Sequence, residues 1–183
     1  MGFRRSRSES KDSDLSFTPE QWDEKARGWI LGRLTRGPRS KHQLFQMLVQ
    51  KGVPEEISTP LLDRFEDVGL IDDAAYARAF TNYRRETRGL AKSALKRELS
   101  QAGVAAPVIE ETLEPIDSEA DLALATDLVR RRWSSVRNLD WQARQRRLAG
   151  FLGRRGFSGS VIGAAIRAVD AEVAAEADAA GDA

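Results

Sequence analysis

The chain lacks cysteine altogether and has one histidine, His42, among its 183 residues. Without cysteine it can form neither a disulfide nor a thiolate metal site, which fits a reducing compartment. No run approaches the roughly 18 apolar residues that a transmembrane helix needs. The first residues, MGFRRSRSESKDSD, contain no apolar stretch after their arginines, so we expect no secretory signal. We therefore predict a cytoplasmic protein that does not enter a membrane.

Recognisable catalytic motifs are also missing from the sequence. A nucleophile activated by a histidine could use only His42, which falls in the first turn of an expected helix with no obvious triad. No glycine loop of the GxxxxGK type is present to hold a phosphate. Acidic residues are numerous, but they fall at helix starts and on exposed faces, and nothing suggests a metal cage. We expect no enzymatic activity, no cofactor and no metal ion.

A formal net charge of +1 hides charge blocks of alternating sign. Residues 53–75 carry seven acids and one arginine, whereas residues 130–155 carry nine arginines and one aspartate. Residues 84–98 are basic, and residues 110–127 and 170–183 are acidic. Such blocks predict a polarised surface whose basic part binds phosphate or an acidic protein face. The alternative is a set of solvated helix faces without a partner.

Three segments of the sequence resemble one another: LFQMLVQKGVPEEISTPLLD at 44–63, LKRELSQAGVAAPVIEETLE at 95–114 and LAGFLGRRGFSGSVIGAAIR at 148–167. Six columns align, namely Leu44, Leu95 and Leu148; Leu48, Leu99 and Leu152; Gly52, Gly103 and Gly156; Val53, Val104 and Phe157; Ile57, Val108 and Val161; and Leu62, Leu113 and Ile166. The glycines lie 51 and then 53 residues apart. This nearly constant spacing indicates an internal repeat of one structural unit.

Each column of the repeat has a physical role. The two leucines, eight and four residues before the glycine, lie on one face of a helix. The glycine permits the left-handed backbone that ends a helix, and the apolar residue after it packs on the last turn. The later apolar residues begin another helix that faces the same core. Each repeat therefore contains at least two helices.

A further helix precedes each pair, because capping residues stand in front of an apolar pattern. The residues that open these helices are Thr18-Pro19, Asp72-Asp73 and Ser118. For the paired aspartates a capping role is favoured over a catalytic one, since acids stabilise the start of a helix. Pro60 would cost roughly 3 kcal/mol inside a helix, so the third helix either begins late, near Thr59, or is kinked, and we favour the late start.

The sequence thus predicts an all-α protein of three tandem three-helix repeats that form an elongated, curved array. The repeats span residues 18–71, 72–117 and 118–172. No segment alternates in the manner of a strand. We expect a disordered tail at 1–17 and an acidic, alanine-rich tail at 173–183.

Cations on the later helices are the candidate binding residues, because a basic surface needs exposed guanidinium and ammonium groups. The candidates for contact with a partner or nucleic acid are Arg84, Arg85, Arg88, Lys92, Lys96, Arg130, Arg131, Arg132, Arg144, Arg147, Arg154 and Arg155. Arg147 and Arg154 share one face of the eighth helix, with Arg144 nearer its border. Trp133 and Trp141 stand among these arginines and could stack on nucleotides, although packing is the favoured interpretation.

A spaced constellation of residues carries a resemblance to a known family. It consists of Gly69-Leu70-Ile71-Asp72-Asp73, Tyr76-Ala77, Phe80, Arg84, Gly89, Glu98-Leu99 and Gly103-Val104. With RGPRSKHQLFQMLVQKGVPEEI before it, this constellation resembles the RecX family, regulators of the bacterial recombinase RecA. The similarity covers about residues 22–170 and is weaker in the last repeat. Pro60 and SSVRNLD at 134–140 depart from the plainest family pattern.

The resemblance implies a curved array of three-helix repeats that binds in the groove of the RecA filament on single-stranded DNA. Members of the family block filament growth and inhibit ATP hydrolysis and strand exchange, which modulates recombination, DNA repair and the SOS response. They have no enzymatic activity of their own. We expect a monomer whose partner is this filament, and direct contact with single-stranded or double-stranded DNA remains open.

Two other functions compete with this expectation. Three-helix units resemble helix-turn-helix domains, so the protein could bind DNA autonomously through its basic helices. Such binding would weaken steeply with salt and would need no recombinase. A scaffold of helical repeats with an unrelated partner is the third alternative.

Overall fold

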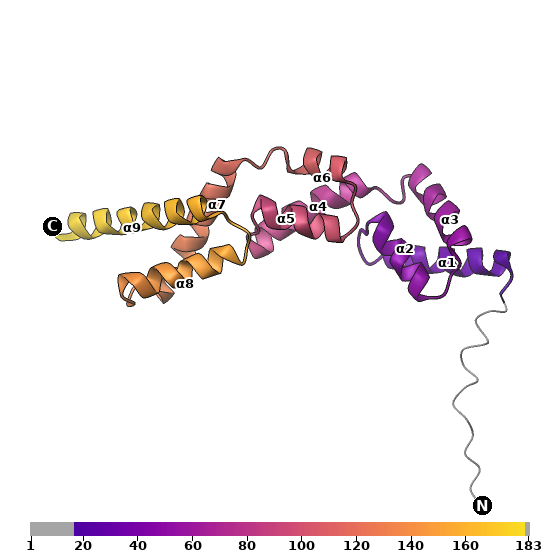
Figure 1. The fold of residues 1–183 in the computed structure, drawn as a ribbon, viewed down its shortest axis with the longest axis horizontal. Helices are drawn as coiled ribbons and strands as arrows, with labels where there is room; N and C mark the ends of the chain where they lie inside the picture. Colours follow the sequence, from indigo (N-terminus) through magenta and orange to yellow (C-terminus); the bar gives the residue numbers. More distant parts are fainter. Residues whose placement is uncertain (1–16, 182–183) are drawn as a thin grey trace, which may run out of the picture. The chain divides into compact units, whose positions relative to one another are not determined.

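The described residues fold into helices and the turns between them (Figure 1). The computed structural model describes residues 17–181, so the predicted disordered tail lies outside this range except for Phe17. The elements are α1 (Pro19–Leu34), α2 (Lys41–Gln50), α3 (Glu55–Asp67), α4 (Asp73–Arg88), α5 (Lys92–Gln101), α6 (Ala106–Leu113), α7 (Ser118–Arg132), the 3-10 turn η2 (Trp133–Ser135), α8 (Trp141–Gly153) and α9 (Gly159–Gly181). No strand occurs within residues 17–181, which confirms the all-α class. Within the same range, no helix has both the length and the apolar character that crossing a membrane requires.

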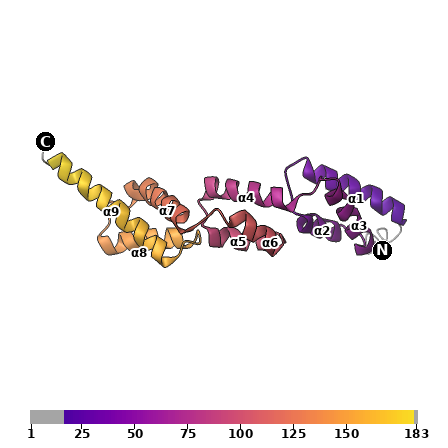
Figure 2. The same cartoon turned by 90° about the horizontal axis from the view of Figure 1, so that it is seen from above.

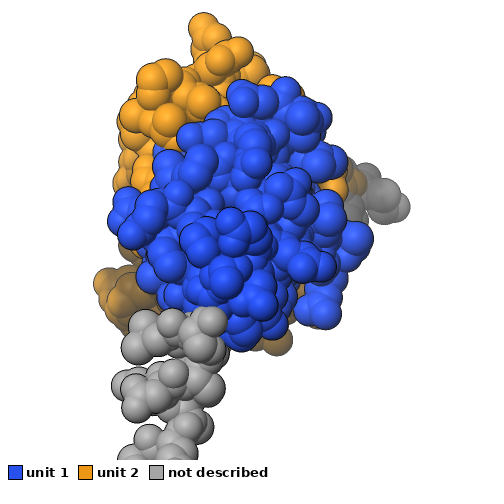
Figure 3. Space-filling model, turned by 90° about the vertical axis from the view of Figure 1, so that its right-hand side faces the viewer, with its two compact units in different colours: residues 1–76, 102–104 blue, residues 77–101, 105–183 orange. Residues whose placement is uncertain are grey.

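The helices gather into two compact units, which Figure 3 colours separately. Unit 1 holds the described chain up to Tyr76 together with residues 102–104, and unit 2 holds residues 77–101 and the chain from residue 105 onward. Figure 2 shows α7, α8 and α9 together within unit 2, where α9 contacts both other helices. All twelve candidate cations belong to unit 2.

The predicted repeat columns have the same burial in all three copies. The six leucines of the first two columns are fully buried. The residue after each glycine, which is Val53, Val104 or Phe157, is at most 6% exposed. The three glycines, in chain order, adopt φ values of +81°, +76° and +88°. This left-handed backbone favours glycine, as expected for a residue that ends a helix.

Helix starts follow the capping residues of the sequence, with one shift. The Thr18 side chain accepts a hydrogen bond from the backbone N–H of Gln21, and the Gln21 side chain accepts one from the backbone N–H of Thr18. This reciprocal pair is the capping box that stabilises the start of α1. Asp117 rather than Ser118 caps α7, because its Oδ1 accepts from the N–H of Ala120 at 2.7 Å. The predicted helix begins where expected, but its cap lies one residue earlier.

The paired aspartates at the start of α4 have two different roles. Asp72 accepts a hydrogen bond from the backbone N–H of Ala75 at 2.8 Å, which confirms the predicted cap. Asp73 instead accepts from the backbone N–H of Lys41 at 2.8 Å, so it satisfies the first N–H of α2, whose N-cap is Ser40. Burial raises the pKa of Asp73, and the hydrogen bond from Lys41 opposes that rise. The second aspartate therefore connects α4 to α2 within unit 1.

Pro60 lies inside α3, so the expected late start near Thr59 is wrong. The helix runs without interruption from Glu55 to Asp67. A proline at this position removes the hydrogen bond to the carbonyl of Glu56, which belongs to the first helical turn. Because Glu56 is exposed, water is available to that end of the helix and lowers the cost of the proline.

Each unit has an apolar core of its own. Buried residues of unit 1 include Trp22, Leu44 and Leu62, and those of unit 2 include Val129 and Leu148. The core of unit 2 joins α7, α8 and α9, so the positions of the arginines on α7 and α8 are fixed by packing. Helix α9 continues to Gly181, so the predicted tail from residue 173 onward is helical up to that point.

Candidate anion-binding surface

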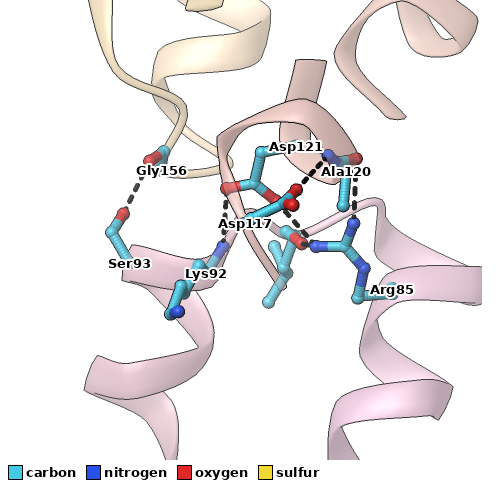
Figure 4. Close-up of polar contacts among 8 residues, drawn as sticks. Arg85, Lys92, Ser93, Asp117, Ala120, Asp121 and Gly156 are labelled. Atoms are coloured by element: carbon cyan, nitrogen blue, oxygen red, sulfur yellow. Dashed lines mark hydrogen bonds and ion pairs between the residues drawn. The ribbon is translucent and has the colours of Figure 1, made fainter. Parts of the chain in front are cut away.

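Asp121 joins three helices of unit 2 (Figure 4). Its Oδ1 lies 2.7 Å from Nη1 of Arg85 on α4, and its Oδ2 accepts from the backbone N–H of Lys92 at 3.1 Å. Arg85 also donates to the carbonyl of Ala120 at 3.2 Å. The Arg85 side chain is only 19% exposed. This candidate cation is therefore part of the joint between α4, α5 and α7.

The repeat glycines add a second contact to such joints. Ser93 on α5 donates a hydrogen bond to the carbonyl of Gly156 at 2.6 Å (Figure 4). A Cβ at Gly156 would lie 2.8 Å from Cβ of Ala94, so only glycine fits there without a shift. Gly103 packs in the same manner against His42 in unit 1. The histidine that a catalytic site would have required thus lies against a helix end.

Five of the twelve candidate cations form ion pairs within unit 2. The pairs are Arg84 with Glu98 at 3.0 Å, Arg85 with Asp121 at 2.7 Å, Lys96 with Glu110, Arg130 with Asp127 at 2.5 Å and with Glu172 at 2.9 Å, and Arg144 with Asp170 at 3.4 Å. The carboxylate of each pair already neutralises part of the positive charge that an external anion would meet. Their contribution to a partner contact is correspondingly smaller than the sequence suggests.

Two of the remaining arginines converge on the aromatic ring of Phe151, and a third lies next to them. The guanidinium carbon of Arg132 lies 4.8 Å from the ring centroid, and that of Arg155 lies 3.8 Å from it. Arg155 also donates to the carbonyls of Phe151 at 3.1 Å and Arg88 at 2.9 Å. Arg154 directly follows α8. We name Arg132, Arg154 and Arg155 the arginine cluster.

The arginine cluster concentrates positive charge without a neighbouring carboxylate. Burial, and then the charges of Arg132 and Arg154, lower the pKa of Arg155. Among the described residues, no acidic side chain forms an ion pair with any of the three arginines. Guanidinium groups recognise phosphates and carboxylates through paired hydrogen bonds, and an anion here would relieve the mutual repulsion. The cluster is therefore the best candidate for an anion-binding site.

The last four candidates are separate from the cluster or only border it. Arg88, Arg131 and Arg147 are exposed, and Lys92 is half-buried. The carbonyl of Arg88 accepts from the Arg155 side chain, so its backbone adjoins the cluster. The predicted set thus divides into five paired cations, three clustered arginines and four others.

Aromatic residues beside the arginines behave differently from one another. Trp133 is half-buried and Arg144 lies 4.9 Å from its ring centroid, in line with the packing interpretation. Trp141 is 62% exposed, so the packing interpretation is wrong for this residue. Phe151 was not among the candidates, and its only sequence signal is its position one helical turn before Arg155.

A metal centre finds no support in the described part of the chain. No group of three or more histidine, aspartate or glutamate side chains there is arranged to hold a metal ion. The surface instead offers arginines around an aromatic ring and a set of internal ion pairs.

Comparisons with known proteins point to one family. Residues 72–113 match the family model described as RecX, second three-helix domain, and residues 119–166 match that of RecX, third three-helix domain. The chain is 42% identical over 149 residues to the regulatory protein RecX of Streptomyces coelicolor, which covers 81% of this chain and 79% of that protein. It is 40% identical over 161 residues to the regulatory protein RecX of Thermobifida fusca, with coverage of 88% and 85%.

Solved structures with a similar fold carry the same name. The crystal structure of RecX from Lactobacillus salivarius superposes with a TM-score of 0.72 at 18% sequence identity, over 82% of this chain and 98% of that chain. A second crystal structure, of regulatory protein RecX, gives a TM-score of 0.68 at 23% identity, over 87% and 78% of the two chains. These two structures support the helical fold.

Proposed function

The chain belongs to the RecX family of regulatory proteins, and from this premise we propose that it regulates the recombinase RecA by binding the filament that RecA forms on single-stranded DNA. The binding blocks filament extension and inhibits ATP hydrolysis and strand exchange. In this way the protein modulates recombination, DNA repair and the SOS response.

The observation that supports a contact through unit 2 is the arginine cluster. Arg132 and Arg155 stack on Phe151, the charge of Arg154 acts on Arg155, and none of the three has a carboxylate partner among the described residues. A nucleoprotein filament presents phosphates and acidic side chains, both of which suit a guanidinium group. The stacking and the two carbonyl bonds of Arg155 hold the site in place before binding, which lowers the entropic cost of association.

Helical repeats suit a partner that is itself a repeating assembly. Binding across neighbouring recombinase subunits would weaken their interface and prevent the addition of further subunits. In this mechanism the arginine cluster supplies the attraction, and the helical framework supplies the steric block. The protein performs no chemistry of its own in it.

Charge reversal at Arg132 and Arg154 tests the proposal. Arg155 is left unchanged, because its bonds to two backbone carbonyls make it part of the fold. We expect the double variant Arg132→Glu with Arg154→Glu to need a concentration at least about tenfold higher for half-inhibition of RecA ATP hydrolysis, since lost charged contacts cost more than ~1.4 kcal/mol. The assay uses preformed filaments, with the protein well below the recombinase concentration.

A matched control separates this site from net charge. The double variant Arg36→Glu with Lys51→Glu makes the same change of charge at two exposed residues of unit 1. We expect it to inhibit nearly as well as the unaltered protein, and circular dichroism should show that both variants remain helical. Equal inhibition by the two double variants would rule out the arginine cluster as the contact.

Autonomous DNA binding is the alternative that the same cluster favours, because phosphate is also an anion. It predicts tight binding to a labelled oligonucleotide without recombinase, with an affinity that falls steeply as salt rises. Fluorescence anisotropy across a salt series distinguishes the two functions. Strong inhibition at ratios far below one protein per recombinase subunit, together with weak binding to bare DNA, supports the filament as the target.

A further inference from the structure

Helix α9 is longer than its packing requires. Val169 is its last buried residue and Val173 is partly buried, whereas residues 174–179 are all exposed. A helical extension without apolar contacts gains nothing from burial, which is the main source of helix stability in proteins. The extension is acidic, with Glu176 and Asp178 in it.

Two acidic residues of α9 form ion pairs with candidate cations. Glu172 accepts two hydrogen bonds from Arg130 on α7, from Nε at 3.1 Å and from Nη2 at 2.9 Å. Asp170 lies 3.4 Å from Arg144 on α8. The middle of α9 thus pairs with two members of the candidate set, one on α7 and one on α8.

The two pairs differ in how easily they can be exchanged. In the first, the Arg130 side chain is 51% exposed and that of Glu172 is 44% exposed. In the second, the Arg144 side chain is 18% exposed and lies over the ring of Trp133. Exposed ion pairs contribute little to stability, whereas half-buried pairs are part of the packing. Of these two pairs, the one between Arg130 and Glu172 is suited to reversible exchange, and the exposed pair of Arg130 with Asp127 joins residues of the same helix.

We propose that Glu172 is a built-in competitor that occupies Arg130 in the free protein and is displaced when the filament supplies its own anionic groups. The proposal rests on the proposed function, and it adds Arg130, a cation outside the arginine cluster, to the contact of unit 2 with the filament. The carboxylate of Glu172 accepts from Nε and Nη2 of Arg130, two donors that a phosphate or carboxylate of the filament would use, while Asp127 on α7 holds the third nitrogen, Nη1. Because Glu172 is exposed, little free energy is needed to displace it from Arg130. The competitor therefore lowers the affinity for the filament without blocking the site.

The geometry also explains why the competitor is carried on a rigid helix. Residues 165, 166 and 169 anchor α9 in the core of unit 2 about one turn before Glu172. A carboxylate held at a fixed place acts at a high effective concentration, which a flexible acidic tail could not match. Asp170 reinforces this anchor through Arg144, and it is a positioning residue in the proposal.

The test replaces the carboxylate by an amide of the same shape. We expect Glu172→Gln to inhibit RecA ATP hydrolysis at a concentration about two- to fivefold lower than the unaltered protein, since an exposed ion pair contributes only weakly and its loss has a small effect. Glu176→Gln is the matched control, because it removes the same charge one turn further along an exposed stretch of the same helix. An equal or larger gain for Glu176→Gln, or no gain for Glu172→Gln, would overturn the proposal.

A double-mutant cycle with Arg130→Gln makes the test specific. If Glu172 acts by occupying Arg130, its replacement should give no gain once Arg130 is absent. A gain that persists in the Arg130→Gln background would contradict the proposal. The unaltered protein is the reference for the function itself, and its failure to inhibit RecA would refute the proposed function. Equal inhibition by the unaltered protein and all variants would refute only the proposal that Glu172 competes for Arg130.

Discussion

Asp73 and Asp121 occupy corresponding places in two joints of the repeat, but they differ in their electrostatic surroundings. Each carboxylate accepts a hydrogen bond from the backbone N–H of a lysine at the start of a helix, Lys41 or Lys92. Asp121 also pairs with Arg85, whereas burial raises the pKa of Asp73. The same contact with a helix start is therefore made by an ion-paired carboxylate in one joint and by a carboxylate that burial disfavours in the other.

Replacement by asparagine should separate the two aspartates. We expect Asp121→Asn to lower the free energy of unfolding by about 1–3 kcal/mol, because it leaves the half-buried Arg85 without its carboxylate. Asp73→Asn keeps an acceptor oxygen and removes a charge that burial disfavours, so its unfolding free energy at pH 7 should be unchanged or higher. Urea denaturation followed by circular dichroism measures both changes.

The pH dependence gives this comparison a definite sign. Because the pKa of Asp73 is raised in the folded protein, the fold binds that proton more tightly than the unfolded chain does. Any advantage of Asp73→Asn should therefore be present at neutral pH and disappear as pH falls below the unfolded value, about 3.9. An advantage that grew on acidification would contradict the assigned role of burial.

The sequence predicts which residues are cationic, but not which of them are free. Arg85 meets an acid 36 residues later in the chain, and Arg130 meets one 42 residues later. Such pairs depend on how the helices pack, and local periodicity carries no information about it. The arginine cluster likewise forms only because α7 and α8 bring Arg132 and Arg155 to Phe151.

At the scale of the helices, the repeat glycines are positions where substitution by alanine should lower the free energy of unfolding. Gly156 combines a φ of +88° with a close approach to Ala94, whereas Gly28 lies within α1 in open space. We expect Gly156→Ala to cost at least about 1–2 kcal/mol of unfolding free energy, the price of a left-handed residue alone. Gly28→Ala should stabilise by about 0.5–1 kcal/mol, because alanine is the better helix former.

Thermal melting of the two alanine variants checks this prediction. Gly28→Ala controls for the substitution itself, since both changes add one methyl group. A Gly156→Ala variant as stable as the unaltered protein would mean that the backbone at this turn differs from the one described.

Helix number, order and most boundaries follow from caps, glycines and apolar spacing, because these signals are local. Pro60 shows where local rules fail: its cost depends on whether the exposed first turn of α3 can lose one hydrogen bond. The length of α9 is a second such case. Its last turns lack the apolar pattern of a packed helix, and the ion pairs of Asp170 and Glu172 with distant arginines are visible only in the fold.

At the scale of the whole molecule, the three repeats are distributed over two compact units, a division that the periodic sequence does not reveal. The repeat columns make each three-helix group look alike, but contacts between groups decide which of them form one unit. In unit 2, the joint at Asp121 and the contact of Ser93 with Gly156 tie the second and third groups together (Figure 4). The candidate cations all lie in this unit, so the proposed contact with the filament is a property of unit 2.

The absence of cysteine offers a direct test of that contact. Gly153 at the end of α8 directly precedes Arg154, is exposed, and has no atom within 4 Å of an added Cβ. A Gly153→Cys variant therefore carries a single thiol beside the arginine cluster, to which a photoactivated crosslinker can be attached. Gly28→Cys places the same thiol on an exposed, open position of unit 1 and serves as the comparison.

Photocrosslinking of the labelled Gly153→Cys variant to assembled RecA filaments tests the central claim most directly. If the arginine cluster contacts the filament, illumination should join the label to recombinase or to DNA, and the adduct should be lost when Arg132 and Arg154 are both changed to glutamate. A labelled protein that still inhibits the filament but gives no adduct from position 153 would contradict the account.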